Sequence, residues 1–468
     1  MARERAAARR HPTRSGRVME AIAQDARTAL ERSVLDAFRE TRSPRDPDWL
    51  SKVRRAAIER FRETGFPTAR DEAWKYTNVA PILKVPFAPA AEAGPRRIEN
   101  LEAVDWPGQT GAQLVFVNGR YAAELSSVPP SVEGIEIASL REVLANRPET
   151  AEPHLARIAH EGNAFADVNS ALLEDGAFVR IPAGLVVPEP IHLIFLSEPD
   201  FGPTISHPRN LVIAEPGSEA VIVESWIGTA GALYFTNAVT EVVVGEGAVL
   251  DFYKLERESV DAFHVATMEI LQKRDSTFTS HSITLGGALV RNDLNVRLDA
   301  PGAGCTLNGL FLGSGTQHLD NHTLIDHAQP HGTSRELYKG IMSGRSRGVF
   351  NGRIIVRQDA QKTDAMQTNK NLLLSREALV NSEPALEIFA DDVKCRHGST
   401  IGQLDETAMF YLRSRGIGEQ EARALLVYAF ASDVASRIRI APLREMVEKH
   451  LGLRLPGGAG VGLSGARS

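Results

Sequence analysis

Hydrophobic and polar positions near the start of the chain follow a helical spacing. In VMEAIAQDARTALERSVLDAF, which begins at Val18, apolar residues recur every three or four positions with charged residues between them. A second helix is predicted after Asp46-Pro47-Asp48, through WLSKVRRAAIERFRET, and is expected to end at Gly65 because glycine favours the position that follows a helix. With the Pro- and Ala-rich linker FAPAAEAGP, these helices define an N-terminal helical region over residues 18–111.

Between residues 112 and 394 the pattern changes to short strands. Runs of Val, Ile, Leu, Phe and Thr alternate with Gly, Pro, Asn and Asp, and the segment PHLARIAHEGNAFADVNSALLEDG is the main helical exception. Turns recur at Pro216, Gly245, Arg274 and Pro301, a spacing of roughly 28 residues that falls within the range for coils of a solenoid. This segment is therefore predicted to be one repetitive core.

Side chains within one such unit alternate between two faces. Ala220, Ile222 and Glu224 are expected on one face and Val221, Val223 and Ser225 on the opposite one, so that one set points inward and the other outward. An antiparallel sandwich would also give short strands with regular turns. Tight Asn-Gly or Asp-Gly hairpins are missing between most of the strands, however, and the repeat is long. The predicted fold class is mainly β: a right-handed parallel β-helix flanked by N-terminal and C-terminal α-helical regions.

The chain is predicted to become helical again over residues 395–455. LDETAMFYLRSRG has Asp405 as its N-cap and Gly416 just past its end, and PLREMVEKHLG forms a short final helix. Between them, GIGEQEARALLVYAFASDVASRI predicts an amphipathic helix with one apolar face. That face comprises Ala422, Leu425, Leu426, Ala429 and Phe430. The Gly-rich tail, residues 456–468, lacks the composition to fold.

Composition and charge limit the possible partners. A chain of 468 residues with 43% hydrophobic residues is expected to form two or three structural regions. The net charge of −6 offers no general attraction to nucleic acid or to an anionic membrane, and no stretch approaches the roughly 20 apolar residues of a membrane helix. The chain has only two cysteines, which fits a reducing compartment, so we expect a cytoplasmic protein.

The first residues, 1–17, are rich in arginine. An organelle transit peptide would look similar, but such peptides are usually also Ser-rich and amphipathic. We therefore expect a disordered, solvated arm.

Motifs for nucleotide or acyl chemistry are weak or missing. The GxGxxG of Gly460, Gly462 and Gly465 has no strand before it and no helix after it, and the sequence contains no GxxxxGK[ST] and no GxSxG. A dispersed Ser–His–Asp set cannot be judged from composition. Any ATP chemistry is therefore expected to belong to a partner.

Two short segments carry side chains that bind metals. In HLDNHTLIDHAQPHG, an extended backbone would place His318, Asp320 and His322 on one face, which could suit zinc or ferrous iron, although a hydrogen-bonded strand face is the favoured interpretation. In CRH, Cys395 and His397 would share a side and could bind iron or a nascent cluster. Two ligands do not complete a site, and buried cysteines often serve as small apolar fillers. Cys305, in a Gly-rich turn, is interpreted as such a filler.

Several longer passages resemble the SufD family of iron–sulfur cluster assembly proteins. These are GFPTARDEAWKYT from Gly65, VFNGRIIVRQDAQKTDAMQTNKNLLLS from Val349, ALEIFADDVKCRHGSTIGQLDETAMFYLRSRGI from Ala385, and LRLPGG near the end. The match is dense over about the last hundred residues, and the Arg-rich arm falls outside it.

The resemblance implies a non-catalytic subunit that pairs with SufB through its β-helix and binds the ATPase SufC through its C-terminal helices, with a homodimer possible in isolation. No stably bound cofactor is implied; iron or an iron–sulfur cluster would be held transiently, with Cys395 and His397 as candidate shared ligands near the SufB interface. Candidate SufC contacts are Tyr411, Arg415, Leu425, Leu426, Tyr428 and Phe430. A SufB-type scaffold, which would be expected to carry more cysteines, and a β-helical polysaccharide lyase or hydrolase remain the alternatives.

Overall fold

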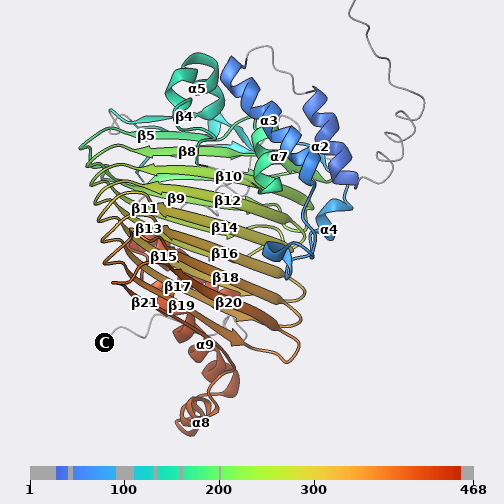
Figure 1. Cartoon of the computed structure of the whole chain (residues 1–468). Coiled ribbons are helices and arrows are strands. Elements are labelled where there is room, and N and C mark those ends of the chain that lie inside the picture. The colour runs from blue at the N-terminus through green and yellow to red at the C-terminus, as the bar shows by residue number, and fades with distance from the viewer. Residues whose placement is uncertain are drawn as a thin grey trace, which may run out of the picture.

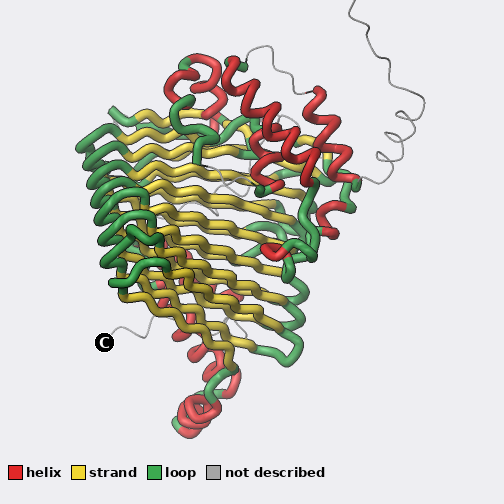
Figure 2. The backbone as a smooth tube through the Cα atoms, viewed as in Figure 1, coloured by secondary structure: helices red, strands yellow, loops and turns green. Residues whose placement is uncertain are grey.

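The strands form two long sheets that face each other along one stack. The computed structural model describes residues 28–40, 46–90, 110–129, 134–158, 162–199 and 202–454; the predicted arm and tail, residues 1–17 and 456–468, lie outside them. The chain passes from one sheet to the other at each turn, which makes the stack a parallel β-solenoid (Figures 1 and 2). The solenoid expected from the sequence is confirmed.

Sheet A is built from β4, the even-numbered strands from β8 to β20, and β1, β5 and β7, and its main order is β20-β18-β16-β14-β12-β10-β8-β5-β4. From β5 to β20 the neighbours are parallel and in register, and only β4 pairs antiparallel, at the N-terminal end. The bounds are β1 Ala88–Pro89, β4 Glu136–Ser139, β5 Ala177–Ile181, β7 Thr204–Ser206, β8 Arg209–Ala214, β10 Tyr234–Val244, β12 Phe263–Gln272, β14 Leu289–Leu298, β16 His318–His327, β18 Arg347–Val356 and β20 Leu379–Ile388.

Sheet B has the order β21-β19-β17-β15-β13-β11-β9-β6-β2-β3. It too is parallel except for its first pair, β2 with β3. An antiparallel sandwich, the alternative fold, is therefore excluded. The bounds are β2 Gln113–Val117, β3 Arg120–Tyr121, β6 Ile191–Ser197, β9 Glu219–Gly228, β11 Val249–Arg257, β13 Thr277–Thr284, β15 Gly304–Gly313, β17 Thr333–Met342, β19 Asp364–Leu373 and β21 Lys394–Gly402.

The predicted turns lie just before strands of sheet B. Gly217, Gly247 and Gly302 have positive φ angles of 68°, 64° and 78°, and Asp275 takes the equivalent place with φ of 54°. Glycine reaches this backbone region without strain, and aspartate tolerates it better than most residues. The turn spacing read from the sequence therefore marks successive coils.

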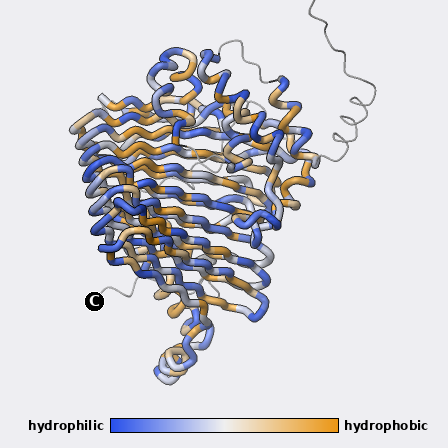
Figure 3. The backbone as a smooth tube through the Cα atoms, in the orientation of Figure 1, coloured by the Kyte–Doolittle hydropathy of each residue, from blue (hydrophilic) through white to orange (hydrophobic). Residues whose placement is uncertain are grey.

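The solenoid interior holds the main core, and Figure 3 shows hydrophobic and hydrophilic segments alternating along its strands. Ala220, Ile222 and Glu224 are the buried inward set. Val223 and Ser225, on the opposite face, are also buried. Val223 belongs to a cluster with residues of the C-terminal helices, so the outer face of sheet B is covered there rather than exposed.

N-terminal helices pack on the outside of sheet A near its first coils (Figure 1). The predicted second helix is confirmed as α3, with Gly65 as its C-cap, whereas α5 and α6 were not predicted. The helical exception inside the core is confirmed as α7. The bounds are α2 Ala29–Glu40, α3 Asp48–Thr64, η1 Glu72–Trp74, α4 Ala80–Leu83, η3 Ala123–Leu125, α5 Leu140–Asn146, α6 Pro148–Ala151 and α7 Ala164–Leu172.

The C-terminal part forms α8 Glu406–Ser414, α9 Glu419–Ala435 and α10 Ala441–Arg454. Asp405 caps α8 by accepting hydrogen bonds from the backbone of Thr407 and Ala408, as predicted. The last strand, β21, continues past the expected boundary at residues 394/395 to Gly402, so the helices begin later than the sequence indicated. Among the described residues, no helix is long and apolar enough to cross a membrane.

Helix α9 packs on sheet B mainly through residues beside the apolar face that the sequence predicted. Val427, Ala431 and Val434 are fully buried there, whereas Ala429 is exposed and Phe430 is half-buried. Small and β-branched side chains allow the helix to approach the sheet closely, so the larger residues are displaced to its flank. Leu425, Leu426 and Phe430 of the predicted apolar face are left half-buried, and their partner role stays a prediction.

Candidate functional site

The candidate ligands Cys395 and His397 lie on β21, the last strand of sheet B. In the ladder Cys395 pairs with Ala365 and His397 with Gln367 of β19. Ala365 and Gln367 are both buried inside the solenoid, and paired residues of a parallel sheet share a face. The two candidate ligands therefore face the interior side at the end of the stack, on one side of the strand as the sequence predicted.

Cys395 is half-buried and packs against the main core. This burial raises the pKa of its thiol above the ordinary value. The free chain therefore presents a protonated thiol at neutral pH, and a metal that binds the sulfur would displace that proton.

The surroundings of Cys395 form the open end of the solenoid. Every residue of β21 other than Cys395 is exposed. On the neighbouring sheet, Phe389 follows β20 and is 61% exposed. Pro384 lies within β20, and proline is tolerated inside a strand essentially only at a sheet edge. The edges of β20 and β21 are thus uncovered.

Cys395 and His397 do not form a complete metal site by themselves. Within the described part of the chain, no group of three His, Cys, Asp or Glu side chains is arranged to hold a metal ion. The role of Cys395 and His397 as ligands stays a prediction, and a complete site would need further ligands from another chain.

Two polar residues lie one and two coils below His397. Gln367 donates a hydrogen bond of 2.7 Å from Nε2 to the Glu336 carboxylate, and both side chains are buried. Burial raises the pKa of Glu336 to about 7. Sequence analysis missed this pair because the residues are separated by whole coils, and only the strand register brings them together.

His318, Asp320 and His322 share one face of β16, as predicted. Asp320 accepts hydrogen bonds from Thr77 Oγ1 at 2.5 Å and Arg291 Nη1 at 3.0 Å, and lies 3.0 Å from His322 Nε2. These partners lower the pKa of Asp320 against the opposing effect of its burial. The segment is therefore a hydrogen-bonded anchor for the WKYT motif, in line with the favoured interpretation.

Cys305 is fully interior and 3% exposed. Its column continues through Ser334 and Ala365 to Cys395, so whole coils separate the cysteines. Burial raises the pKa of the Cys305 thiol strongly, which fits an inert filler.

A second polar cluster lies inside the early coils. Lys254 Nζ is 2.9 Å from the Glu256 carboxylate and 3.2 Å from His264 Nε2, and His264 Nδ1 is 2.8 Å from Glu258. All these side chains are buried. Because the charges are paired with one another, the cluster is a closed network and presents no free ligand-binding group at the surface.

The candidate partner contacts lie on the C-terminal helices. Tyr411 on α8 is 57% exposed and stacks with Arg415, whose Cζ lies 5.1 Å from the ring centroid. Phe410, which sequence analysis missed, is 74% exposed. Helix α8 projects beyond the end of the stack (Figure 1). On α9 the half-buried candidates are Leu425, Leu426, Tyr428 and Phe430.

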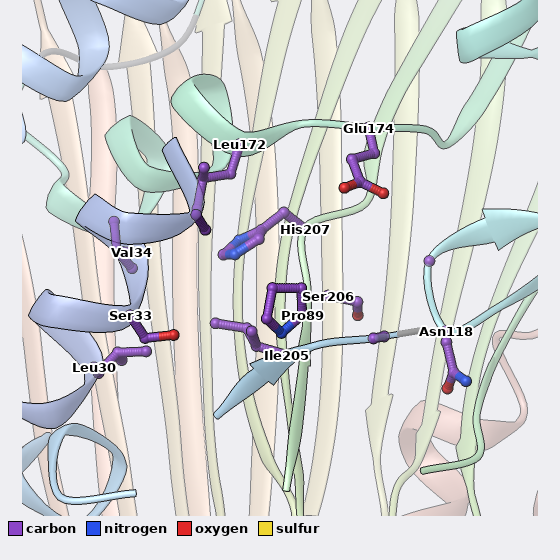
Figure 4. Close-up of a pocket in the computed structure, with 13 residues that line it drawn as sticks. Leu30, Ser33, Val34, Pro89, Asn118, Leu172, Glu174, Ile205, Ser206 and His207 are labelled. Atoms are coloured by element: carbon purple, nitrogen blue, oxygen red, sulfur yellow. The ribbon is translucent and has the colours of Figure 1, made fainter. Parts of the chain in front are cut away.

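Two hollows lie away from Cys395. The first, about 50 Å³, lies between α2, β1 and β7; His207 points into it beside Ile205 and Leu172 (Figure 4), and burial lowers the pKa of His207 to about 3. The second, about 650 Å³, follows the outer face of sheet A, where two of its four lining arginines, Arg353 and Arg357, are paired with Glu387 and Asp326. Neither hollow contains a predicted site residue.

Comparisons with known proteins agree over almost the whole chain. Residues 195–430 match the family model described as "SUF system FeS cluster assembly, SufBD core domain", and residues 29–193 match "SufBD protein N-terminal region". The chain is 34% identical to the iron–sulfur cluster assembly protein SufD of Escherichia coli, covering 86% of this chain and 92% of that protein.

Other relatives are similar to the same extent. An iron–sulfur cluster assembly SufBD family protein of Synechocystis is 33% identical, with 84% of this chain and 89% of that protein covered. The chloroplastic protein ABCI7 of Arabidopsis thaliana is 30% identical, with coverages of 86% and 85%.

Proposed function

This chain belongs to the SufBD family of iron–sulfur cluster assembly proteins, and from that premise we propose that it is a non-catalytic, SufD-type subunit. In this proposal it pairs with a SufB-type paralogue at the open end of the solenoid and binds the ATPase SufC through its C-terminal helices. The iron or cluster would be a transient cargo, held where the open end of this solenoid meets its partner, and would not be a stably bound cofactor of this chain. Two free cysteines suit a reducing cytoplasm.

One observation carries the pairing proposal: the half-buried thiol of Cys395 lies on a strand whose other residues are all exposed. An uncovered edge of this length is a template for strand pairing with another chain. A second solenoid placed there would cover the edge and bring its own side chains to Cys395 and His397. A shared site explains why this chain offers only part of a ligand set.

The SufC proposal rests on α8. Phe410 and Tyr411 are large, exposed and on a helix that extends away from the stack. Exposed aromatic residues with an adjacent arginine are typical of the central contacts of interfaces. Because α9 and α10 pack on sheet B, movement of a partner bound at α8 would be transmitted to the outer face of the solenoid.

The ligand role is tested in the purified complex of this chain with its SufB and SufC partners. Cys395→Ser and His397→Ala are each expected to lower cluster formation by more than about tenfold, measured as visible absorbance and acid-labile sulfide per complex. Cys305→Ser is the matched control, since that thiol is interior, and should leave the yield unchanged. Wild-type yields from both site variants would remove these residues from the site.

A further inference from the structure

Gln367 lies directly below His397 in the interior column at the end of the solenoid. The two residues are register partners on β19 and β21, and adjacent strands in a sheet are about 4.8 Å apart. Gln367 is 1% exposed, whereas His397 is exposed. The buried amide of Gln367 is thus the register neighbour of His397 on the interior side of the ladder.

The amide of Gln367 is itself fixed. Its Nε2 donates to the Glu336 carboxylate at 2.7 Å. A Cβ atom on Gly352 would come within 2.3 Å of the same nitrogen, so the missing side chain there makes room for the NH2 group. Glu336 Oε2 accepts this bond, so the NH2 group of the amide faces Glu336 and Oε1 lies at the other end of the amide.

The other end of this amide lacks a partner. Gln367 Oε1 is buried and has no hydrogen-bond partner in the structure. A buried acceptor without a donor is costly, on the order of 1–3 kcal/mol, and such atoms call for an explanation. The neighbour on the open side of the ladder is His397, whose imidazole carries the kind of N–H that a carbonyl oxygen accepts.

We propose that Gln367 is a positioning residue for His397: its Oε1 accepts a hydrogen bond from one imidazole nitrogen, which leaves the other nitrogen free to bind iron or a cluster. Histidines that bind metals usually donate their second N–H to a carbonyl or carboxylate, which fixes the tautomer and ring orientation. Glu336 acts through Gln367 by holding the amide. This inference deepens the proposed function and rests on it for the identity of the cargo.

The test uses the full chain without metal. The histidines are labelled with ¹⁵N, and long-range ¹H–¹⁵N correlation spectra report the tautomer of each neutral ring, at a pH about two units above the ordinary imidazole pKa of about 6.5. A His397→Asn variant assigns the signal. Wild-type His397 is expected to favour one tautomer by about fivefold, and Gln367→Leu to bring the ratio close to that of free histidine.

Two further variants separate positioning from general damage. Thr368→Val changes the neighbouring residue on the opposite face of β19 and should keep the wild-type tautomer ratio. A double variant, Glu336→Gln with Gln367→Glu, exchanges the two residues and again places an acceptor below His397. It should show the tautomer ratio of wild-type His397. Equal ratios in wild type and Gln367→Leu, with both chains folded, would overturn the proposal.

The tautomer measurement on His397 uses no metal, so its result does not depend on whether this chain binds iron or a cluster. Full cluster yield from Cys395→Ser and His397→Ala complexes would overturn the proposed function and leave the tautomer result standing. If those variants lose cluster formation, Gln367→Leu is expected to lower the yield about 10–100-fold.

Discussion

The hydroxyl of Thr77 donates a 2.5 Å hydrogen bond to the Asp320 carboxylate, and so joins the N-terminal WKYT motif to the middle of the solenoid. The same motif reaches further along the stack, because Tyr76 Oη and Lys75 Nζ both bind Glu383 on β20, at 2.6 and 2.9 Å. Trp74 lies under Arg291, at 3.7 Å from guanidinium carbon to ring centroid. One short segment thus connects several coils.

Removing the Thr77 hydroxyl is expected to weaken this connection. Thr77→Val keeps the shape of the side chain but leaves the buried Asp320 with one donor fewer, at a cost of about 1–3 kcal/mol in the free energy of unfolding. Urea denaturation measures the change. Thr64→Val is the control, because Thr64 is an exposed residue of α3 whose hydroxyl binds only its own helix. Its free energy of unfolding should stay within about 0.5 kcal/mol of wild type. Equal stability of both variants would show that the anchor contributes little.

The stability of the fold is expected to fall with rising pH because of Glu336. Its pKa is raised by burial from 4.5 to about 7, so the unfolded chain loses this proton at lower pH than the folded chain does. The protonated form favours the fold, and that contribution is lost as pH rises from 4.5 through 7, a loss on the order of 2–4 kcal/mol.

Glu336→Gln should remove this dependence, since the amide does not ionise and can still accept from Gln367. Urea midpoints at several pH values would show the variant gaining stability over wild type as pH rises. Glu246→Gln, in an exposed turn, is the matched control. A constant difference between wild type and Glu336→Gln across the range would contradict the raised pKa.

Substitution by alanine should destabilise the fold at one glycine of sheet B and leave it unchanged at another. At Gly309 a Cβ atom would lie 2.2 Å from the ring of buried Tyr338, whereas at Gly398 nothing lies within 4 Å. Gly309→Ala is expected to cost about 1–3 kcal/mol or more, and Gly398→Ala less than about 0.5 kcal/mol. Denaturation of the isolated chain measures both. A tolerated Gly309→Ala would mean that Tyr338 can move.

Docking of the ATPase partner is expected to depend on α8. Phe410→Ser and Tyr411→Ser each remove an exposed aromatic side chain without disturbing the core, and should reduce co-purification with SufC by at least about tenfold if these residues are central contacts. Val260→Ser removes an exposed apolar side chain elsewhere, in the loop before β12, and should have no effect. Undiminished binding by both α8 variants would locate the docking surface elsewhere.

Local signals in the sequence predicted most of the architecture. Turn residues such as Gly217 and Asp275 require unusual backbone angles and recur once per coil, so the repeat was visible in the residue types alone. Asp405 and Gly416 likewise marked the ends of α8. These features depend on nearby residues, which is why they can be read from one sequence.

The features that the sequence did not predict depend on which residues of different coils contact each other. The pair Cys395 and His397 was found because both lie on one strand, two positions apart. Gln367 and Glu336 were not, because neither is unusual until the register places them in one column. The face of α9 that packs on sheet B was not predicted for a similar reason: Val427 and Ala431 are identified as packed residues only by their contact with the sheet.

The two ends of the stack differ, and this limits how copies can combine. The first coils are closed by the short antiparallel strands β3 and β4 and by α5, whereas β20 and β21 are uncovered. Head-to-tail addition, which would build an endless fibre, needs a receptive surface at both ends. In the part of the chain that the structure describes, one end is closed and the other is uncovered, so two copies joined through their uncovered ends would form a closed pair that cannot grow further.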